Sequence, residues 1–88
     1  MRTVYKYDLE IKAGQQKVWM PKFGTIIAVE IQRGKLCIWY EHETGREKTE
    51  YAFQVFGTGF PLPEDIPTTF LKTVFDGPFV WHVYLLHL

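Results

Sequence analysis

Serine is absent from this 88-residue chain, and cysteine occurs once, at Cys37. The absence of serine excludes a serine nucleophile, and a single cysteine excludes an internal disulfide. The chain also lacks an excess of either charge, because ten lysines and arginines balance ten aspartates and glutamates. Proteins that bind duplex nucleic acid gather basic side chains against the phosphates. The balance therefore argues against duplex binding.

The chain has no long hydrophobic run. Its most apolar stretch, residues 78–88, contains two histidines and is about half the ~20 residues that a membrane-spanning helix needs. The amino terminus carries charges throughout and has no apolar signal-peptide core. We therefore expect a single cytoplasmic domain over residues 1–88, with no membrane partner.

Aromatic side chains, in contrast, are abundant. They make up 17% of the residues, and hydrophobic residues in total make up 47%. This composition excludes a disordered chain. A domain of this size buries only a modest core, which large aromatic side chains and oligomerisation both enlarge. The composition is thus typical of a small folded domain that assembles into a homo-oligomer.

Alternating polar and apolar residues predict six or seven short strands and little or no helix. In the third strand, Ile27, Val29 and Ile31 are expected to face one way. The last strand, Phe79–Leu86, is apolar on both faces, which suits a central strand or one covered by another subunit. We expect an all-β antiparallel sandwich or small barrel. The predicted strands span residues 5–11, 17–20, 25–32, 35–43, 47–56, 68–75 and 79–86.

Two glycines flank a hydroxyl in Gly57-Thr58-Gly59. Such a segment can turn successive backbone N–H groups toward an anion, and Arg46 or Lys72 is the basic side chain that a phosphate site would use. No helix is expected to follow, and the spacing does not match a Walker motif. The alternative is that the glycines only let a strand turn into the proline-rich loop.

Trp81 and His82 are neighbours on the last predicted strand, so they face opposite sides of it. His82 is either a hydrogen-bonded structural residue or a ligand contact, because imidazole both donates and accepts near neutral pH. Together with Trp39, these side chains offer stacking and hydrogen bonding to a base. The candidate ligand-binding residues are Gly57, Thr58, Gly59, Arg46, Trp39, Trp81 and His82.

Catalytic and metal sites are not indicated. Glu41 and Glu43 alternate with His42, so a strand presents the carboxylates on one face and the histidine on the other. Cys37 shares a face with Trp39, which favours a small buried hydrophobe over a thiolate. No nucleophile can be paired with a base. We expect a protein that is not an enzyme and uses neither metal nor cofactor.

The loop Phe60-Pro61-Leu62-Pro63 is apolar, rigid and suited to docking. It either packs on the core or forms part of an interface. The charge distribution also favours assembly, since residues 1–35 sum to +4 and residues 36–65 to −4. The candidate interface residues are Phe60, Pro61, Leu62, Pro63, Phe79, Tyr84 and Leu86.

Four segments together resemble a family of short uncharacterised proteins of bacteriophages and bacterial genomes. They are Tyr5–Ile11, Met20-Pro21, Val55–Pro63 with its GTG-x-P-x-P pattern, and the closing Phe79-Val80-Trp81-His82-Val83. The similarity spans nearly the whole chain. Where that family commonly carries histidine after the second glycine, this chain has Phe60, which removes a polar group from the loop.

The resemblance implies a phage or prophage origin and brings no catalytic assignment. Small phage proteins without enzymatic machinery often bind a host component. We therefore expect a non-enzymatic counter-defence protein that sequesters a small signalling nucleotide in an oligomeric pocket. The alternative is a protein-interaction module: an inhibitor of a host protein, or a minor phage structural or assembly component.

Overall fold

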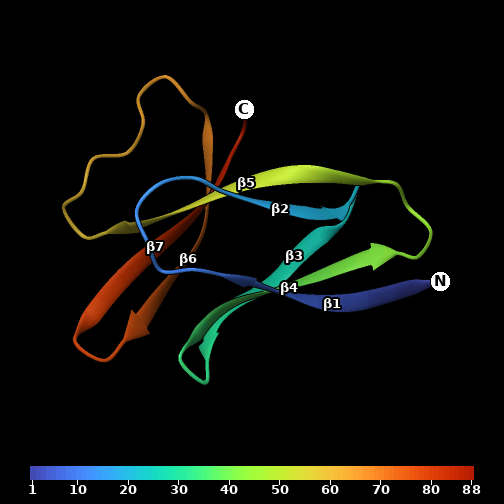
Figure 1. Cartoon of the computed structure of the whole chain (residues 1–88), viewed down its shortest axis with the longest axis horizontal. Coiled ribbons are helices and arrows are strands. Elements are labelled where there is room, and N and C mark those ends of the chain that lie inside the picture. Colours follow the sequence, from blue (N-terminus) through green and yellow to red (C-terminus); the bar gives the residue numbers. More distant parts are fainter.

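The computed structural model describes residues 1–88 as two antiparallel β-sheets packed face to face (Figure 1). Sheet A has the strand order β1-β4-β3, and sheet B has the order β2-β5-β7-β6. The all-β sandwich prediction is confirmed. The strands are β1 Arg2–Leu9, β2 Gln16–Pro21, β3 Thr25–Gln32, β4 Lys35–Glu43, β5 Lys48–Gly57, β6 Thr68–Asp76 and β7 Phe79–Leu86.

The core lies between the sheets and follows the alternation of their strands. Phe53 and Val83 of sheet B are fully or nearly fully buried, as are Leu36 and Ile38 of sheet A. β7 is central in sheet B, with β5 on one side and β6 on the other. The prediction of a central strand is confirmed, because both edges of β7 are paired.

Tight turns explain two of the strand connections. Arg33 and Gly34 join β3 to β4 with φ of 52° and 78°, the backbone that a two-residue type I′ hairpin turn requires. At the β6–β7 hairpin Asp76 pairs with Phe79, so the central turn residues are Gly77 and Pro78. Gly77 has φ of 57°, and the fixed φ of proline suits the position after it.

A β-bulge in β3 overturns one expectation about that strand. The pairing of β3 with β4 shifts between Ile26 and Ala28, which leaves Ile27 as an extra residue. Ile26 consequently packs on the core, whereas Ile27 is 53% exposed. The prediction that Ile27 faces the same way as Val29 is wrong, because period-two alternation fails wherever a bulge inserts a residue.

The corner between β2 and β3 depends on Tyr40. Its hydroxyl donates to the carbonyl oxygen of Pro21 and accepts the backbone N–H of Gly24 at 2.9 Å. The backbone N–H of Lys22 donates to the carbonyl oxygen of Glu47 at 2.9 Å. Tyr40 is only 3% exposed, and burial raises the pKa of its phenol to about 12. One side chain of sheet A thus fixes the chain where it leaves sheet B.

Alkaline titration checks this corner. An unfolded tyrosine ionises near pH 10, so between about pH 10 and pH 12 the folded protein holds a proton that the unfolded chain loses. The stabilisation from Tyr40 is complete below pH 10 and falls by about 2–3 kcal/mol as pH rises to 12. Absorbance at alkaline pH should show a late tyrosine that Tyr40→Phe removes. If no titration step disappears in that variant, the assignment to Tyr40 is wrong.

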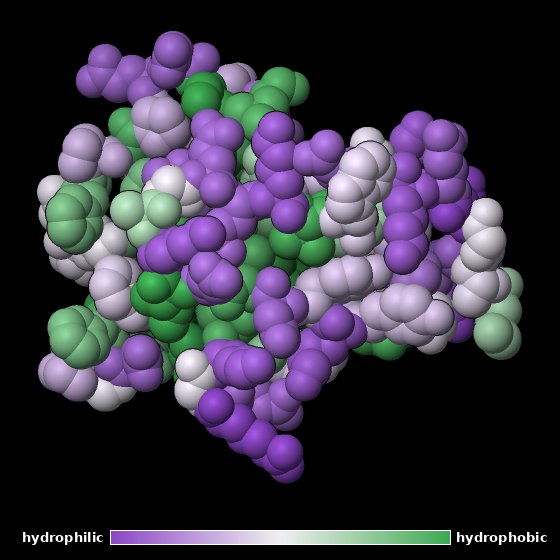
Figure 2. Space-filling model, viewed as in Figure 1, coloured by the Kyte–Doolittle hydropathy of each residue, from purple (hydrophilic) through white to green (hydrophobic).

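The outer face of sheet B is unusually aromatic. Phe56 lies edge-to-face with Tyr84, and Tyr84 with Phe70, at ring separations of 5.6 and 5.5 Å. Figure 2 shows hydrophobic side chains gathered over β6, β7 and the adjoining loop, and a more hydrophilic surface at the opposite end.

The loop of residues 58–67 forms no helix, and no helix in the structure could cross a membrane.

Candidate functional site

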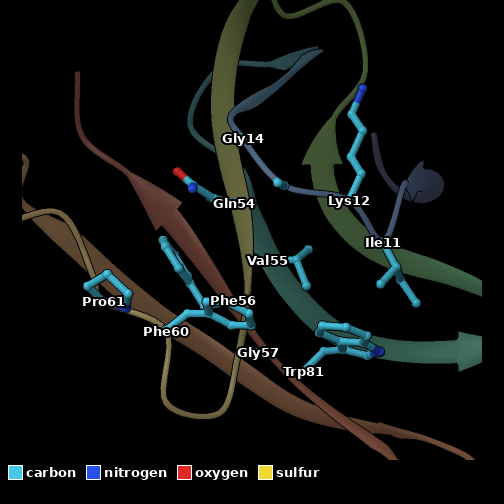
Figure 3. Close-up of a pocket in the computed structure, with 11 residues that line it drawn as sticks. Ile11, Lys12, Gly14, Gln54, Val55, Phe56, Gly57, Phe60, Pro61 and Trp81 are labelled. Atoms are coloured by element: carbon cyan, nitrogen blue, oxygen red, sulfur yellow. The ribbon is translucent and has the colours of Figure 1, made fainter.

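The most apolar hollow of the protein is a groove beside the end of β5, with a volume of about 370 Å³. We call it the Trp81 groove. Figure 3 shows Val55 and Trp81 between Ile11 on one side and Phe60 and Pro61 on the other. The groove is lined by residues 11–14, residues 54–57, Phe60, Pro61 and Trp81. Its volume lies within the range of about 300–1,000 Å³ typical of ligand sites.

The floor of the groove is a strand edge without a partner. β2 pairs with β5 only over residues 48–53, because β2 begins at Gln16, opposite Phe53. β5 continues to Gly57 and is paired there with β7 alone. In an antiparallel strand, alternate residues direct their N–H and C=O to opposite sides. Every second residue of Gln54–Gly57 therefore offers a donor and an acceptor to the groove.

One wall of the groove is formed by the chain between β1 and β2. Gln16 holds this loop closed, because its side-chain oxygen accepts the backbone N–H of Glu10 at 2.8 Å and its amide donates to the Glu10 carbonyl. Gly14 takes a φ of 91°, a backbone conformation that favours glycine. The loop is thus pinned at both ends while residues 11–14 face β5.

The other wall depends on Gly57. A Cβ at this position would lie 2.7 Å from the ring of Phe60 and 3.3 Å from Trp81. The backbone N–H of Phe60 donates to the carbonyl oxygen of Gly57 at 3.1 Å, and Gly59 has φ of 91°. This is a β-turn with glycine at the position that needs positive φ. The turn folds the Phe60 ring back over the end of β5.

The charge of the groove is low. Lys12 is its single charged lining residue, and its amine lies 3.1 Å from a carboxylate oxygen of the exposed Glu10. Such an exposed ion pair is weak and exchanges readily for another anion. The groove contains no nucleophile–base pair. Its chemistry is apolar contact, main-chain hydrogen bonding and one mobile positive charge, which suits binding.

His82 and Thr58 belong to a separate polar cluster on the outer face of sheet B. The two ring nitrogens of His82 lie 2.8 Å from the Thr58 hydroxyl and 2.9 Å from the Thr73 hydroxyl. Both nitrogens are therefore used within the chain, one donating and one accepting in the neutral ring. This cluster ties the start of the 58–67 loop to β6 and β7.

The remaining candidate ligand residues are scattered. Arg46 lies in the turn between β4 and β5, separated from Gly57 by the full length of β5, roughly 30 Å. Its guanidinium stacks over the ring of Phe23 at 5.6 Å. Trp39 pairs with Lys6 and Ala28 in sheet A, while Trp81 lies in sheet B. Within one chain these side chains do not form one pocket.

The candidate interface residues differ in exposure. Phe60, Leu62 and Phe79 are exposed, whereas Leu86 is buried and Tyr84 is partly covered. Phe79 stacks on Trp81 with ring centroids 5.9 Å apart. Pro61 is exposed and Pro63 is partly buried. A partner that binds these residues would contact the proline-rich loop and the Phe79 ring, but not the buried side chain of Leu86.

Cys37 is buried, and its thiol lies 3.5 Å from a carboxylate oxygen of Asp8. Burial is the main cause that raises the pKa of the thiol above its ordinary value, and the Asp8 carboxylate raises it further. We predict that iodoacetamide at pH 8 alkylates the native protein at least tenfold more slowly than the urea-unfolded chain. Mass spectrometry over time measures both rates, and equal rates would contradict the buried, hydrogen-bonded thiol.

Gly57 and Trp81 are predicted ligand contacts, and Phe60 and Pro61 are predicted interface residues; the structure brings the four together in the Trp81 groove. Residues 11–14 and the free edge of residues 54–56 are not among the predicted residues. A signal was available in the predicted lengths, since the strand at 17–20 is much shorter than the strand at 47–56. A short strand beside a long one leaves part of the long edge unpaired.

Comparison with known proteins gives one match. A family model described as "Domain of unknown function (DUF7352)" covers residues 1–87, so the chain belongs to this family. No curated protein and no solved structure matches the chain.

Proposed function

We propose that this member of the DUF7352 family is a non-enzymatic binding protein, and that it captures an extended segment of a partner protein in the Trp81 groove. The observation that carries the proposal is the free edge of Gln54–Gly57 on the floor of an apolar groove. An extended peptide adds to such an edge as a further strand, with main-chain hydrogen bonds for affinity and side-chain pockets for specificity.

The groove suits a short segment. The unpaired edge covers four residues of β5, so the added strand forms only a few main-chain hydrogen bonds. The exposed ring of Phe60 and the proline beside it supply the apolar contact that the hydrogen bonds need. The phage origin implied by the sequence resemblance would make the partner a host protein or a phage assembly component.

A second candidate ligand is a small signalling nucleotide, sequestered to counter host defence. The aromatic rings of Phe60 and Trp81 and the amine of Lys12 line the same groove, and a base stacks on such rings. Lys12 alone would meet the phosphates within one chain. We therefore propose the nucleotide only as the second candidate ligand.

The test uses the full chain and a library of short random peptides. We expect selection to enrich extended, apolar sequences that bind with a Kd of roughly 1–100 µM. Phe60→Ala should weaken their binding at least tenfold. Phe75→Ala is the matched control, because Phe75 is 70% exposed, Phe60 is 68% exposed, and Phe75 lies outside the groove. Equal loss in both variants, or no enriched peptide, would contradict the proposal.

The second part of the experiment measures the melting temperature of the protein in the presence of cyclic dinucleotides and of ADP-ribose. A nucleotide at 100-fold excess over its Kd stabilises a protein by ~2.7 kcal/mol, which is roughly 10–20 °C for a domain of this size. Stabilisation that disappears in Phe60→Ala and Lys12→Ala would establish the nucleotide and overturn the peptide proposal. The peptide proposal expects a shift near zero.

A further inference from the structure

The free edge of β1 is the largest uncovered edge in the fold. Sheet A ends in β1 and β3, and sheet B ends in β2 and β6. The edges of β3 and β6 approach each other, with Lys72 and Glu30 forming an ion pair at 3.2 Å between them. β2 is short and ends at Pro21. β1 presents eight residues with a partner strand on one side only, and Figure 1 shows no strand beyond it.

We propose that β1 pairs with β1 of a second copy, so that two A sheets join into one continuous sheet around a two-fold axis. A long unpaired strand is a template for another strand, and an identical strand is the simplest partner because a two-fold interface is self-complementary. The proposal is independent of the Trp81 groove, which lies beside β5.

The charges of β1 select one register. Arg2, Val4, Lys6 and Asp8 lie on the outer face of sheet A, on the same side as their partners Glu43, Glu41, Trp39 and Cys37. A two-fold axis perpendicular to the sheet keeps outer residues opposite outer residues. With the axis at Tyr5, Arg2 faces Asp8 of the second copy at both ends, and Val4 faces Lys6. No like charges meet in this register.

The other registers are less favourable, because they bring like charges together or align fewer residues. An axis at Val4 places Arg2 opposite Lys6, and an axis at Lys6 places the two Lys6 side chains opposite each other. Like charges directly opposite on neighbouring strands are destabilising. An axis at Tyr7 does pair Lys6 with Asp8, but it aligns only residues 5–9 of the strand, whereas the Tyr5 axis aligns residues 2–8.

The exposed apolar side chains of β1 lie at the proposed axis. Val4 is 45% exposed and Tyr5 is 51% exposed. In the dimer the two Tyr5 rings face each other on the inner side, beside the His42 rings that each already contacts edge-to-face at 4.9 Å. Aromatic cross-strand pairs stabilise sheets. One strand pair makes a small interface, so we expect a weak dimer with a Kd of about 10–100 µM.

Sedimentation equilibrium of the full chain from micromolar to millimolar concentration tests the register. Arg2→Asp and Asp8→Arg should each raise the dimer Kd about tenfold, because each turns two attractive pairs into two repulsive pairs. The double variant should restore the wild-type Kd. Lys48→Asp makes a matched change of charge at an exposed residue of β5 and should have no effect. Thermal unfolding confirms that each variant is folded.

Three results would overturn the proposal. The first is a wild-type chain that stays monomeric at millimolar concentration. The second is a dimer that Asp8→Arg weakens and Arg2→Asp does not, which would indicate the Tyr7 register. The third is a dimer that both single variants weaken but the double variant does not restore, which would show that the two side chains do not face each other.

Discussion

Gly24→Ala should lower the free energy of unfolding by about 3 kcal/mol or more, making it one of the most damaging single-methyl additions in the chain. A Cβ at this position would lie 2.3 Å from Cζ of Tyr40 and 2.6 Å from the carbonyl oxygen of Glu41. The ring cannot move aside cheaply, because it is buried in the core and its hydroxyl bonds both Pro21 and Gly24. Overpacking and broken buried hydrogen bonds add in the same direction.

The matched control is Gly14→Ala. Gly14 has φ of 91°, but a Cβ there would meet nothing within 4 Å. It should cost about 1 kcal/mol from backbone strain alone. Since 1 kcal/mol corresponds to roughly 4–8 °C in a domain of this size, melting temperatures separate the two variants easily. A Gly24→Ala protein as stable as Gly14→Ala would show that Tyr40 does not occupy this corner.

Phe53→Ala should reduce stability by about 3–5 kcal/mol, which is a large part of the ~5–13 kcal/mol expected for a domain of 88 residues. Phe53 is the largest of the fully buried side chains. It lies on β5 between Gln16 of β2 and Leu85 of β7, so its ring packs where the two sheets meet. Truncation leaves a cavity that strands on both sides hold open.

Urea unfolding measures the loss, with Phe75→Ala as the control. Phe75 lies on the edge strand β6 and is largely exposed, so its truncation should cost less than about 0.5 kcal/mol. The two variants delete the same atoms and differ only in burial. Equal midpoints for both would contradict the placement of the core between the sheets.

Alternation of polar and apolar residues predicts the bounds of a strand correctly where turn residues mark its ends. The strands at 25–32, 35–43 and 79–86 have the predicted bounds because turn residues mark both ends. The first strand runs over Arg2–Leu9 and not residues 5–11. Its start is set by pairing of Arg2 with Glu43, a non-local contact. Ile11, which continues the alternation, lines the groove instead.

The candidate site was harder to predict because it is assembled from distant segments. Gly57, Phe60 and Pro61 are close in sequence, and the glycines and prolines around them predict a turn and a loop. Lys12 and Gly14 reach the same groove only because β2 begins at Gln16, opposite Phe53. Arg46 and Gly57 both suit a phosphate site by chemical type, but the length of β5 separates them. Spacing along the sequence carries no information about strand register across a sheet.

Amide hydrogen exchange along β5, read by NMR, tests the central claim most directly. In the free protein every second amide of Gln54–Gly57 should exchange quickly, while the alternating amides bonded to β7 and those paired with β2 stay protected. A selected peptide should slow the fast amides at least tenfold and leave residues 48–53 unchanged. Protection of all four amides in the free protein, or a bound peptide that leaves the fast amides unchanged, would contradict strand addition at the Trp81 groove.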